Sequence, residues 1–226
     1  MTALVIQARL DSTRLFRKSL LPLGGRPLIF RVMEALGIVD CEVKVLACPE
    51  DSAAAFAPLA EEAGFCLVPG PKEDVLARYC LAIKRFHPDR IIRVTGDNPF
   101  TFTDAAEFLN AEAAALGCDY AGYYGLPHGA GIESNNAEAM LRAEREASSP
   151  YDREHASPYL YNHPELFLVH RPLAPLRWQG HTMRVTVDTP EDYKRAGQLY
   201  AALSALPLAE RNKGEAVIAA YRNIGL

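Results

Sequence analysis

The stretch Ala3-Leu-Val-Ile-Gln-Ala-Arg-Leu-Asp-Ser-Thr-Arg-Leu-Phe-Arg-Lys-Ser-Leu20 joins a short apolar run to a cationic loop. The apolar run, residues 3–6, is typical of a buried β-strand, and the loop after it carries four basic side chains, Arg9, Arg14, Arg17 and Lys18. Residues 20–28 then lead through two glycines and Pro27 into an apolar-periodic segment that predicts a helix. A buried strand that ends in a cationic loop before a helix is the usual geometry of a phosphate site in an open α/β sheet.

Positive charge is concentrated in this opening stretch. The first 31 residues hold six Lys and Arg side chains against one acid, Asp11, whereas the rest of the chain holds 18 basic and 27 acidic residues. A locally positive loop on an acidic body suits a small polyanion such as a nucleoside triphosphate. A long nucleic acid, which needs a broad basic face, is not an expected partner. From composition alone, a solvated basic turn stays open as the alternative.

The composition indicates a globular fold, because 49% of the residues are hydrophobic, and the length of 226 residues suits one large domain or a domain with a small appended subdomain. The five cysteines are scattered and form no C-x-x-C pair, which favours reduced thiols over a zinc site. No apolar run approaches the roughly 18–20 residues that span a bilayer, and Met1-Thr2 runs directly into the first strand. We therefore expect a cytoplasmic protein that does not bind a membrane.

Strands and helices alternate through the first half of the chain. Apolar and β-branched runs predict strands, and apolar periodicity bounded by glycine, proline and acidic caps predicts helices. This order predicts an α/β fold with a doubly wound, mostly parallel sheet. The expected strands are 3–6, 42–47, 65–68 and 90–95, and the expected helices are 28–36, 53–63 and 74–86.

The second half is less regular, and we expect an irregular α+β arrangement there. Five tyrosines gather between residues 123 and 161, a density typical of association surfaces. Residues from about 120 to 182 are therefore expected to form an inserted region for acceptor binding and homodimer formation, with an aromatic lid over a monomeric site as the alternative. The expected strands are 119–124, 167–170 and 183–187, the expected helices are 103–117, 137–147, 189–203 and 214–221, and 151–164 is a polar, aromatic segment.

Two aspartates directly follow predicted strands. Asp97 follows 90–95 in a Gly-Asp-Asn-Pro turn, and Asp188 follows 183–187 before a Thr-Pro turn. Open α/β sheets place ligands at the carboxyl ends of strands, and two carboxylates there can share one Mg²⁺ whose other ligands are phosphate and water. A cap or turn role explains either aspartate alone just as well. The pair beside a cationic loop favours a metal–triphosphate site.

The segment Ile6-Gln-Ala-Arg-Leu-Asp-Ser-Thr-Arg-Leu-Phe-Arg-Lys-Ser-Leu20 resembles the opening I-x-A-R-x-x-S-T-R-L-P-G-K-x-L of the cytidylyltransferases that activate acidic sugars. These are the CMP-KDO and CMP-sialic acid synthetases and their spore coat polysaccharide biosynthesis protein F relatives. Four further segments resemble the spore coat branch: Glu73-Asp-Val-Leu-Ala-Arg-Tyr79, Arg93-Val-Thr-Gly-Asp-Asn-Pro99, Asp152-Arg-Glu-His-Ala-Ser-Pro-Tyr159 and Arg184-Val-Thr-Val-Asp-Thr-Pro-Glu-Asp192. The resemblance implies a single nucleotidyltransferase domain of the Rossmann-like nucleotide-diphospho-sugar transferase architecture, and it implies homodimers.

The resemblance also implies a reaction. CTP and a small acidic sugar give a CMP-sugar and pyrophosphate, for surface polysaccharide or glycan precursors, with Mg²⁺ as the cofactor. Transfer at the α-phosphate needs charge neutralised on the leaving pyrophosphate. The matching positions imply catalytic roles for Lys18, Arg14 and Asp97, metal binding by Asp97 and Asp188, nucleotide binding by Gln7, Ala8, Arg9, Ser12, Arg14, Lys18, Arg78 and Asp97, and acceptor binding by Glu133, Arg153, Glu154 and His155. A surface ion pair for Arg78 and a structural role for His155 stay open.

One departure from the family pattern is Phe16-Arg17, where the family has Pro-Gly. Glycine there allows a positive φ and a close approach to phosphates. An arginine either crowds the loop or points into the site as an added cation, and the loss of the neighbouring proline favours the second outcome.

Two other functions stay open. One is a glycosyltransferase of related sheet architecture that uses a nucleotide sugar, although only Asp97 with Asn98-Pro99 stands where such enzymes often carry a D-x-D metal motif. The other is a non-catalytic sugar-nucleotide binder, which the Phe16-Arg17 change would suit. Release of pyrophosphate from a nucleoside triphosphate separates a nucleotidyltransferase from both.

Overall fold

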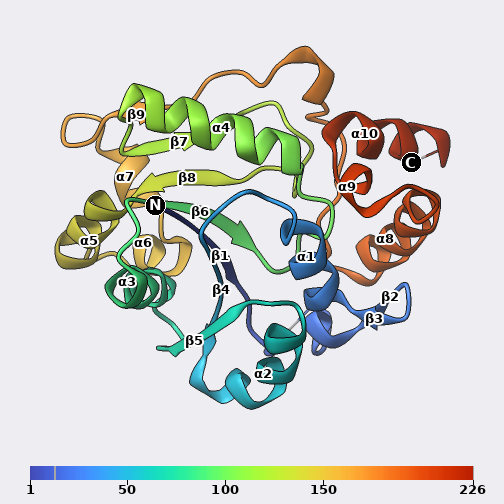
Figure 1. The fold of residues 1–226 in the computed structure, drawn as a ribbon, viewed down its shortest axis with the longest axis horizontal. Coiled ribbons are helices and arrows are strands. Elements are labelled where there is room, and N and C mark those ends of the chain that lie inside the picture. Colours follow the sequence, from blue (N-terminus) through green and yellow to red (C-terminus); the bar gives the residue numbers. More distant parts are fainter. Residues whose placement is uncertain (13, 226) are drawn as a thin grey trace.

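The fold is organised around strand β1 (Thr2–Gln7), which lies inside a seven-stranded sheet of order β5-β4-β1-β6-β8-β7-β9 (Figure 1). The computed structural model describes residues 1–12 and 14–225. β1 pairs in parallel with β4 (Val43–Pro49) on one side and with β6 (Arg90–Thr95) on the other. β5 (Cys66–Gly70) pairs in parallel with β4. These pairings confirm the predicted α/β fold with a mostly parallel sheet.

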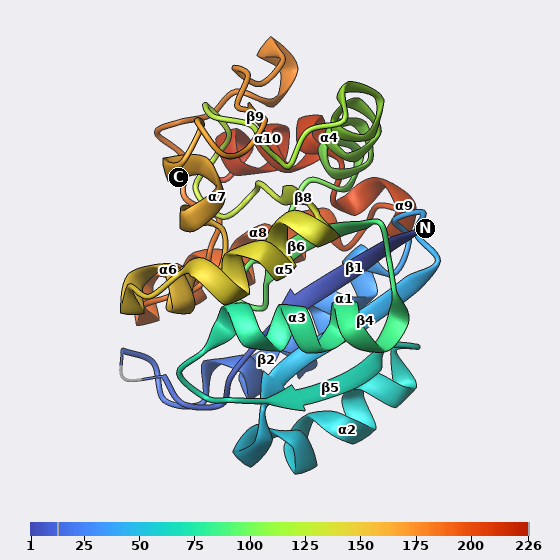
Figure 2. The same ribbon diagram turned by 90° about the vertical axis from the view of Figure 1, so that its left-hand side faces the viewer.

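Helices cover both faces of the sheet, as a doubly wound fold requires. Alternate residues of β1 point to opposite faces, so that Leu4 and Ile6 belong to one core cluster and Ala3 and Val5 to the other. Figure 2 shows α3 and α5 side by side over the sheet. The first core lies under α1 (Leu28–Leu36), α2 (Ala53–Glu62), α4 (Thr103–Leu116), α8 (Pro190–Leu203) and α10 (Gly214–Asn223), and the second under α3 (Val75–Phe86), α5 (Ala137–Glu146) and α7 (Pro158–Asn162).

Several helix boundaries follow capping residues in the sequence. The Asp74 carboxylate accepts a hydrogen bond from the Ala77 N–H at 2.9 Å and so begins α3, as predicted. Thr189 begins α8 in a reciprocal capping box with Asp192. α4 begins at Thr103, as predicted, but its N-cap residue is Phe102, which makes no side-chain hydrogen bond. Gly117 ends that helix in the left-handed conformation, as expected of a C-terminal glycine.

The second half departs from the predicted strands. β8 (Glu133–Asn136) is a strand the sequence did not predict, and it pairs antiparallel with β6 and with β7 (Tyr120–Gly122). β9 (Val169–His170) is shorter than predicted and pairs in parallel with β7. The predicted strand at 183–187 is wrong: that segment is extended, but it bonds to the loop around His128 and to Asp97 and joins no sheet.

The polar, aromatic segment folds into α6 (Pro150–His155) and α7, two short helices (Figure 1). The remaining elements are the hairpin of β2 (Pro22–Leu23) and β3 (Arg26–Pro27), the 3₁₀ turns η1 (Lys18–Leu20), η2 (Glu50–Ser52) and η3 (Leu176–Trp178), and the short helix α9 (Leu208–Arg211). Within residues 1–12 and 14–225, no helix combines the length and hydropathy needed to cross a membrane.

Candidate active site

A cavity of about 350 Å³ opens at the carboxyl ends of β1 and β6. From β1 the chain moves outward to β4 and β5 and then returns to β6 on the other side, so this edge is the topological switch point where such sheets bind ligands. The structure places most of the predicted site residues on its wall. These are Gln7, Ala8, Arg9, Ser12, Arg14, Lys18, Arg78, Asp97, Glu154, His155 and Asp188.

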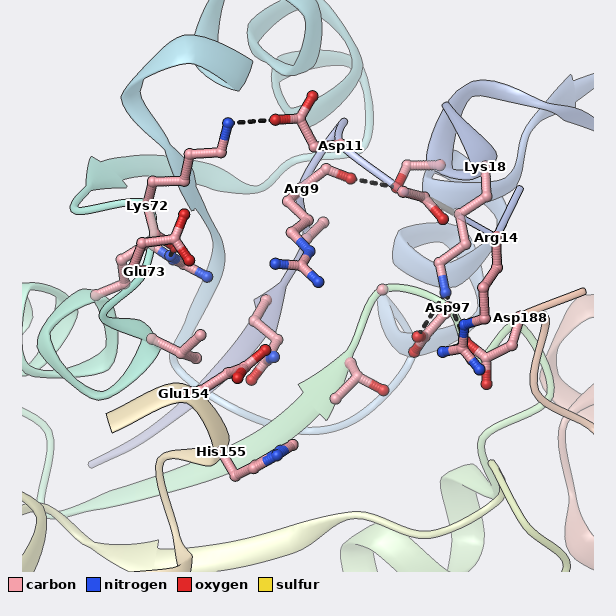
Figure 3. A pocket seen from close by; sticks show the side chains of 18 of the residues that line it. Arg9, Asp11, Arg14, Lys18, Lys72, Glu73, Asp97, Glu154, His155 and Asp188 are labelled. Carbon is pink, nitrogen blue, oxygen red and sulfur yellow. Dashed lines mark hydrogen bonds and ion pairs between the residues drawn. The ribbon is translucent and has the colours of Figure 1, made fainter. Parts of the chain in front are cut away.

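Lys18 joins the two predicted metal-binding aspartates. Its Nζ lies 2.9 Å from Oδ2 of Asp97, 2.8 Å from Oδ1 of Asp188 and 3.0 Å from the Val187 carbonyl oxygen (Figure 3). The Arg14 guanidinium lies 3.3 Å from the same Asp188 oxygen. The two carboxylates therefore converge on the Lys18 ammonium, and the metal ion that the sequence predicted between them stays a prediction.

Short backbone connections hold this cluster together. The Val187 N–H donates to the Asp97 carbonyl at 2.9 Å, which ties the segment before Asp188 to the turn after β6. Gly96 allows β6 to approach β1 closely, because a Cβ there would lie 2.8 Å from the Ala8 Cβ. On the opposite side, the Ser19 hydroxyl donates to the Arg9 carbonyl at 2.9 Å and closes the base of the cationic loop.

The Asp192 carboxylate holds the backbone of Asp188 in place, a role that the sequence did not reveal. Its buried carboxylate accepts hydrogen bonds from Arg184 and from the backbone N–H groups of Asp188 and Thr189. Burial alone would raise the Asp192 pKa, but these donors outweigh it and lower the pKa to about 2. The pKa of Asp188 is also below its ordinary value, since hydrogen bonds and charge from Lys18 outweigh burial. Both carboxylates are thus ionised at neutral pH.

The far wall of the cavity is built around α3. Lys72 forms ion pairs with Asp11 of the cationic loop and, at 3.0 Å, with Asp51. Arg78 donates to the carbonyl oxygens of Pro71 and Lys72 at 2.6 and 2.7 Å, and its side chain is buried. The surface ion pair considered for Arg78 is therefore wrong: this guanidinium shapes the turn that carries Lys72.

Helix α6 brings Glu154 and His155 to the cavity (Figure 3). Arg153 points the other way, forming an ion pair with Asp74 and donating to the Glu144 carbonyl at 2.6 Å. Within the described residues, Arg153 lines neither of the two main cavities, so its predicted contact with the acceptor is not supported. It holds α6 against the start of α3.

Glu133 lies beside a second cavity of about 330 Å³, which shares Arg93 and Thr95 with the first. Its carboxylate accepts from Arg93 at 2.7 Å, from the Ser157 hydroxyl at 2.7 Å and from the Tyr120 hydroxyl at 3.2 Å. Burial would lower the Arg93 pKa, but the facing carboxylate keeps that pKa above its ordinary value. Glu133 and Arg93 therefore form an ion pair at the boundary of the two cavities. Strand β8, which the sequence did not predict, positions Glu133.

Arg17 adopts the conformation that suits glycine. Its φ is 48° and its ψ is 38°, in the left-handed region. Its guanidinium lies 5.7 Å from the centroid of the exposed Phe16 ring, and it is not among the described residues that line the cavity. The expectation that Arg17 points into the site is therefore wrong, and so is the concern that its backbone cannot take the glycine-like turn.

The site residues fit a divalent cation bound together with phosphate. Two carboxylates already converge on the Lys18 ammonium, a cation of one charge. Among the described residues, no three His, Cys, Asp or Glu side chains gather to form a closed metal site. Mg²⁺ matches such a pair, because it takes few protein ligands and completes its shell with phosphate oxygens and water.

Comparison with known proteins identifies similar sequences and similar solved structures. The chain is 33% identical over 210 residues to the spore coat polysaccharide biosynthesis protein SpsF of Bacillus subtilis, covering 90% of this chain and 88% of the relative. A solved cytidylyltransferase from Leptospira borgpetersenii superposes with a TM-score of 0.86 at 23% identity, covering 99% of this chain and 93% of that one. A CMP:2-keto-3-deoxy-manno-octonic acid synthetase complexed with CTP superposes with a TM-score of 0.71 at 17% identity, covering 91% and 99%. The two solved structures show the fold that this chain shares with them.

The family assignment rests on the whole chain. The family model described as cytidylyltransferase matches residues 3–220, a range that contains the cationic loop, both aspartates and α6. The chain therefore belongs to the cytidylyltransferase family and is a nucleotidyltransferase.

Proposed function

We propose that the protein transfers CMP from CTP to a small acidic sugar and releases pyrophosphate, supplying a precursor for surface polysaccharide or glycan synthesis. The observation that carries the proposal is the placement of Lys18 between Asp97 and Asp188, beneath a loop that also presents Arg9 and Arg14. Family membership supports the use of CTP. The name of the Bacillus relative supports a role in polysaccharide synthesis. Because CTP and sugar acids are metabolites of the cytoplasm, we place the reaction there.

The proposed reaction is an in-line displacement at the α-phosphorus. A hydroxyl oxygen of the acceptor forms a bond to the α-phosphorus, the bond from that phosphorus to the bridging oxygen breaks, and pyrophosphate leaves with the electron pair. The acceptor hydroxyl proton passes to water. Lys18 and Arg14 lie where they can neutralise the charge that develops on the leaving group, which is the main requirement of phosphoryl transfer. Arg9 and Ser12 complete the phosphate-facing wall.

We propose Mg²⁺ as the cofactor, held by Asp97 and Asp188. When bound, it would neutralise phosphate oxygens and hold them in one orientation. Lys18 would then turn from the two carboxylates towards the triphosphate, since the same ammonium cannot occupy the metal position. Asp192 and Arg184 would keep Asp188 ionised and oriented throughout.

We propose that the acceptor sugar enters through the second cavity. Arg171 and His128 line this cavity, and a guanidinium suits the carboxylate of a sugar acid. The cavity meets the nucleotide cavity at Arg93 and Thr95, so an acceptor hydroxyl there faces the phosphates. Glu154 and His155 approach from α6 and would bound the acceptor on the other side.

We also propose a homodimer formed through residues from about 120 to 182. Tyr124, Leu173 and Leu176 are exposed there, and Tyr124 and Leu173 lie side by side in a β-bridge. A group of exposed apolar side chains on one surface is typical of an association site.

The proposal is tested by pyrophosphate release. The wild-type protein with Mg²⁺ is incubated with each of the four ribonucleoside triphosphates and a panel of sugar acids. We expect release only with CTP, and only when an accepted sugar is present, together with a CMP-sugar in equal amount. Turnover of a nucleotide sugar without pyrophosphate would instead identify a glycosyltransferase. Binding of CTP without turnover of any acceptor would identify a non-catalytic relative.

A further inference from the structure

Gln7 is the last residue of β1, and its side chain points to the α3 face of the sheet. Along β1, Ala3 and Val5 belong to the core under α3, and Gln7 continues that alternation at the edge of the first cavity. Its carbonyl oxygen Oε1 lies 3.0 Å from Arg93 Nη2 and 3.2 Å from the Tyr79 hydroxyl. These contacts determine which end of the amide faces the cavity.

Arg93 fixes the orientation of the amide. A guanidinium group donates hydrogen bonds and cannot accept them, so it must face the oxygen of Gln7 and not the NH₂ group. The Tyr79 hydroxyl does not fix the amide in the same way. It has one proton to donate, and three acceptor oxygens, those of Val5, Gln7 and Val94, lie within 3.5 Å of it. The Glu133 carboxylate holds Arg93 at 2.7 Å and is itself held by Ser157, which prevents the guanidinium from turning away.

The amide nitrogen of Gln7 is thereby left as a donor towards the cavity. Gln7 lines the first cavity, and within residues 1–12 and 14–225 no protein acceptor lies at hydrogen-bond distance from its Nε2. A flip of the amide would place NH₂ against the guanidinium and remove a hydrogen bond to a charged group, which is among the strongest side-chain hydrogen bonds. The cavity wall therefore offers a hydrogen-bond donor of fixed orientation at this point.

The position of Gln7 indicates which part of a nucleotide it meets. Lys18, Asp97 and Asp188 gather on one side of the cavity, whereas Lys72 and Glu73, just before α3, lie on the opposite side (Figure 3). Gln7 points to the α3 side through its contact with Tyr79. With the triphosphate at the lysine and aspartates, the nucleoside lies towards α3.

We propose that Gln7 is a specificity-determining residue that donates a hydrogen bond to the acceptor edge of the nucleobase and so favours cytosine over uracil. The inference rests on the proposed use of CTP. Cytosine presents two neighbouring acceptors, O2 and N3, whereas uracil presents O2 beside an N3–H donor. An amide that could flip would serve either base, but one locked by Arg93 offers only its donor end.

The test uses Gln7→Glu, which keeps an oxygen for Arg93 and Tyr79 and replaces the donor end with a second oxygen. Mg·CTP and Mg·UTP are titrated calorimetrically into the full-length wild-type and variant proteins. The added negative charge weakens both nucleotides, so the readout is the ratio of the two dissociation constants. We expect the preference for CTP over UTP to fall by about tenfold, the effect of one lost hydrogen bond and one new mismatch.

Two further variants complete the test. Tyr79→Phe removes a hydroxyl that does not fix the amide, so its CTP/UTP ratio should equal that of the wild type. Gln7→Leu has neither donor nor acceptor and should lose the preference without the added charge; it also covers the case in which Gln7→Glu does not fold. An unchanged ratio in both Gln7 variants, or an equal loss of both nucleotides, overturns the inference. If the wild type binds no CTP, both the proposed function and the inference fail. If it binds CTP but the ratio of the two dissociation constants is unchanged in the Gln7 variants, only the inference is overturned.

Discussion

The Asp97 carboxylate makes a single side-chain contact among the described residues, the ion pair with Lys18. In the described part of the chain, its carboxylate has no other hydrogen-bonding side chain, and it is partly exposed. Such a pair contributes little to folding, typically about 1 kcal/mol or less. Loss of this ion pair, as the proposed metal binding requires, would therefore cost the fold little.

Asp97→Asn should accordingly separate folding from catalysis. The amide has the same shape and keeps an oxygen for Lys18, so the melting temperature should stay close to that of the wild type. Turnover, measured as CTP-dependent pyrophosphate release, should fall by about 100-fold or more, since the group that holds charge near the phosphates is gone. Asp40→Asn, at an exposed aspartate outside the cavity, is the matched control. Wild-type turnover in Asp97→Asn would rule out its metal role.

Arg17 gives a second prediction at this scale. A non-glycine residue in the left-handed region costs about 1–2 kcal/mol, and the φ of Arg17 is 48°. Arg17→Gly should therefore raise the free energy of unfolding by about 1 kcal/mol, measured by urea denaturation. Because the guanidinium lies outside the cavity lining, the dissociation constant for Mg·CTP should not change. A tenfold weaker complex would show that Arg17 turns inward when nucleotide binds.

Among elements, α6 carries Glu154 and His155 to the cavity but is only six residues long. A helix of this length has little stability of its own. The ion pair from Arg153 to Asp74 holds it against the start of α3. Within the helix, the rings of Tyr151 and His155 contact each other at a tilt, with 4.5 Å between their centroids. Its C-cap, Ala156, has a φ of 67° and is fully buried, so the packing around it imposes the turn that ends the helix.

Arg153→Ala should loosen α6 although Arg153 does not line the cavity. We expect kcat/KM for the acceptor to fall by about tenfold or more while CTP binding, measured calorimetrically, stays within about twofold, because the phosphate end of the cavity does not depend on α6. Arg153→Lys should recover part of the loss. Arg145→Ala, at an exposed arginine of α5, serves as the control. Equal weakening of CTP and acceptor would contradict a positioning role that acts through α6.

The start of α8 predicts a dependence of stability on pH. The Asp192 pKa is lowered from 3.8 to about 2 in the folded protein, so its carboxylate contributes stability that is complete above pH 3.8 and is lost as the pH falls through 2. Asp192→Asn should lower the free energy of unfolding by about 2 kcal/mol at pH 7. The difference from the wild type, measured by denaturant titration at several pH values, should shrink towards zero near pH 2. A difference that is constant over this range would show that packing, and not charge, is responsible.

The elements also show which parts of the structure the sequence could predict. Strands β1, β4, β5 and β6 were predictable because buried parallel strands are continuous apolar runs with capped helices between them. β8 was not, because its sequence Glu-Ser-Asn-Asn has no apolar alternation and becomes a strand only between β6 and β7. Met183, Val185 and Val187 alternate as in a strand, but they pack along a loop and belong to no ladder.

The same distinction applies to the site. The approach of Asp97 to the cationic loop was predictable, because β1 and β6 are neighbours and their carboxyl ends meet at one sheet edge. Asp188 lies beside them for a different reason: the segment before it belongs to no strand and is held by the hydrogen bond from the Val187 N–H to the Asp97 carbonyl. The partners of Arg93 and Arg153 were not predictable, because each ion pair joins segments whose approach depends on the whole fold: β6 with β8, and α6 with α3. The family resemblance implied acceptor binding for Glu133 and Arg153. Arg153 supports α6 through Asp74, whereas Glu133 lines the second cavity, and its acceptor contact stays a prediction.

For the whole molecule, the exposed apolar surface predicts association. Leu176 is 84% exposed, and Tyr124 and Leu173 are about half exposed, an arrangement that favours burial against a second copy of the chain. Light scattering at micromolar concentration should give about twice the chain mass of 24.8 kDa. Leu173→Asp combined with Leu176→Asp should give the monomer mass with unchanged circular dichroism, and Leu208→Asp should remain dimeric. A wild-type mass of one chain would favour a lid over a monomeric site.

The order of Lys18, Asp97 and Asp188 along the chain has a consequence for biosynthesis. The ribosome makes Lys18 early, Asp97 after 79 further residues, and Asp188 only 170 residues after Lys18. Until Asp188 has been added, the ammonium has one of its two carboxylate partners. A polypeptide that ends before Asp188 therefore cannot bring these three side chains together.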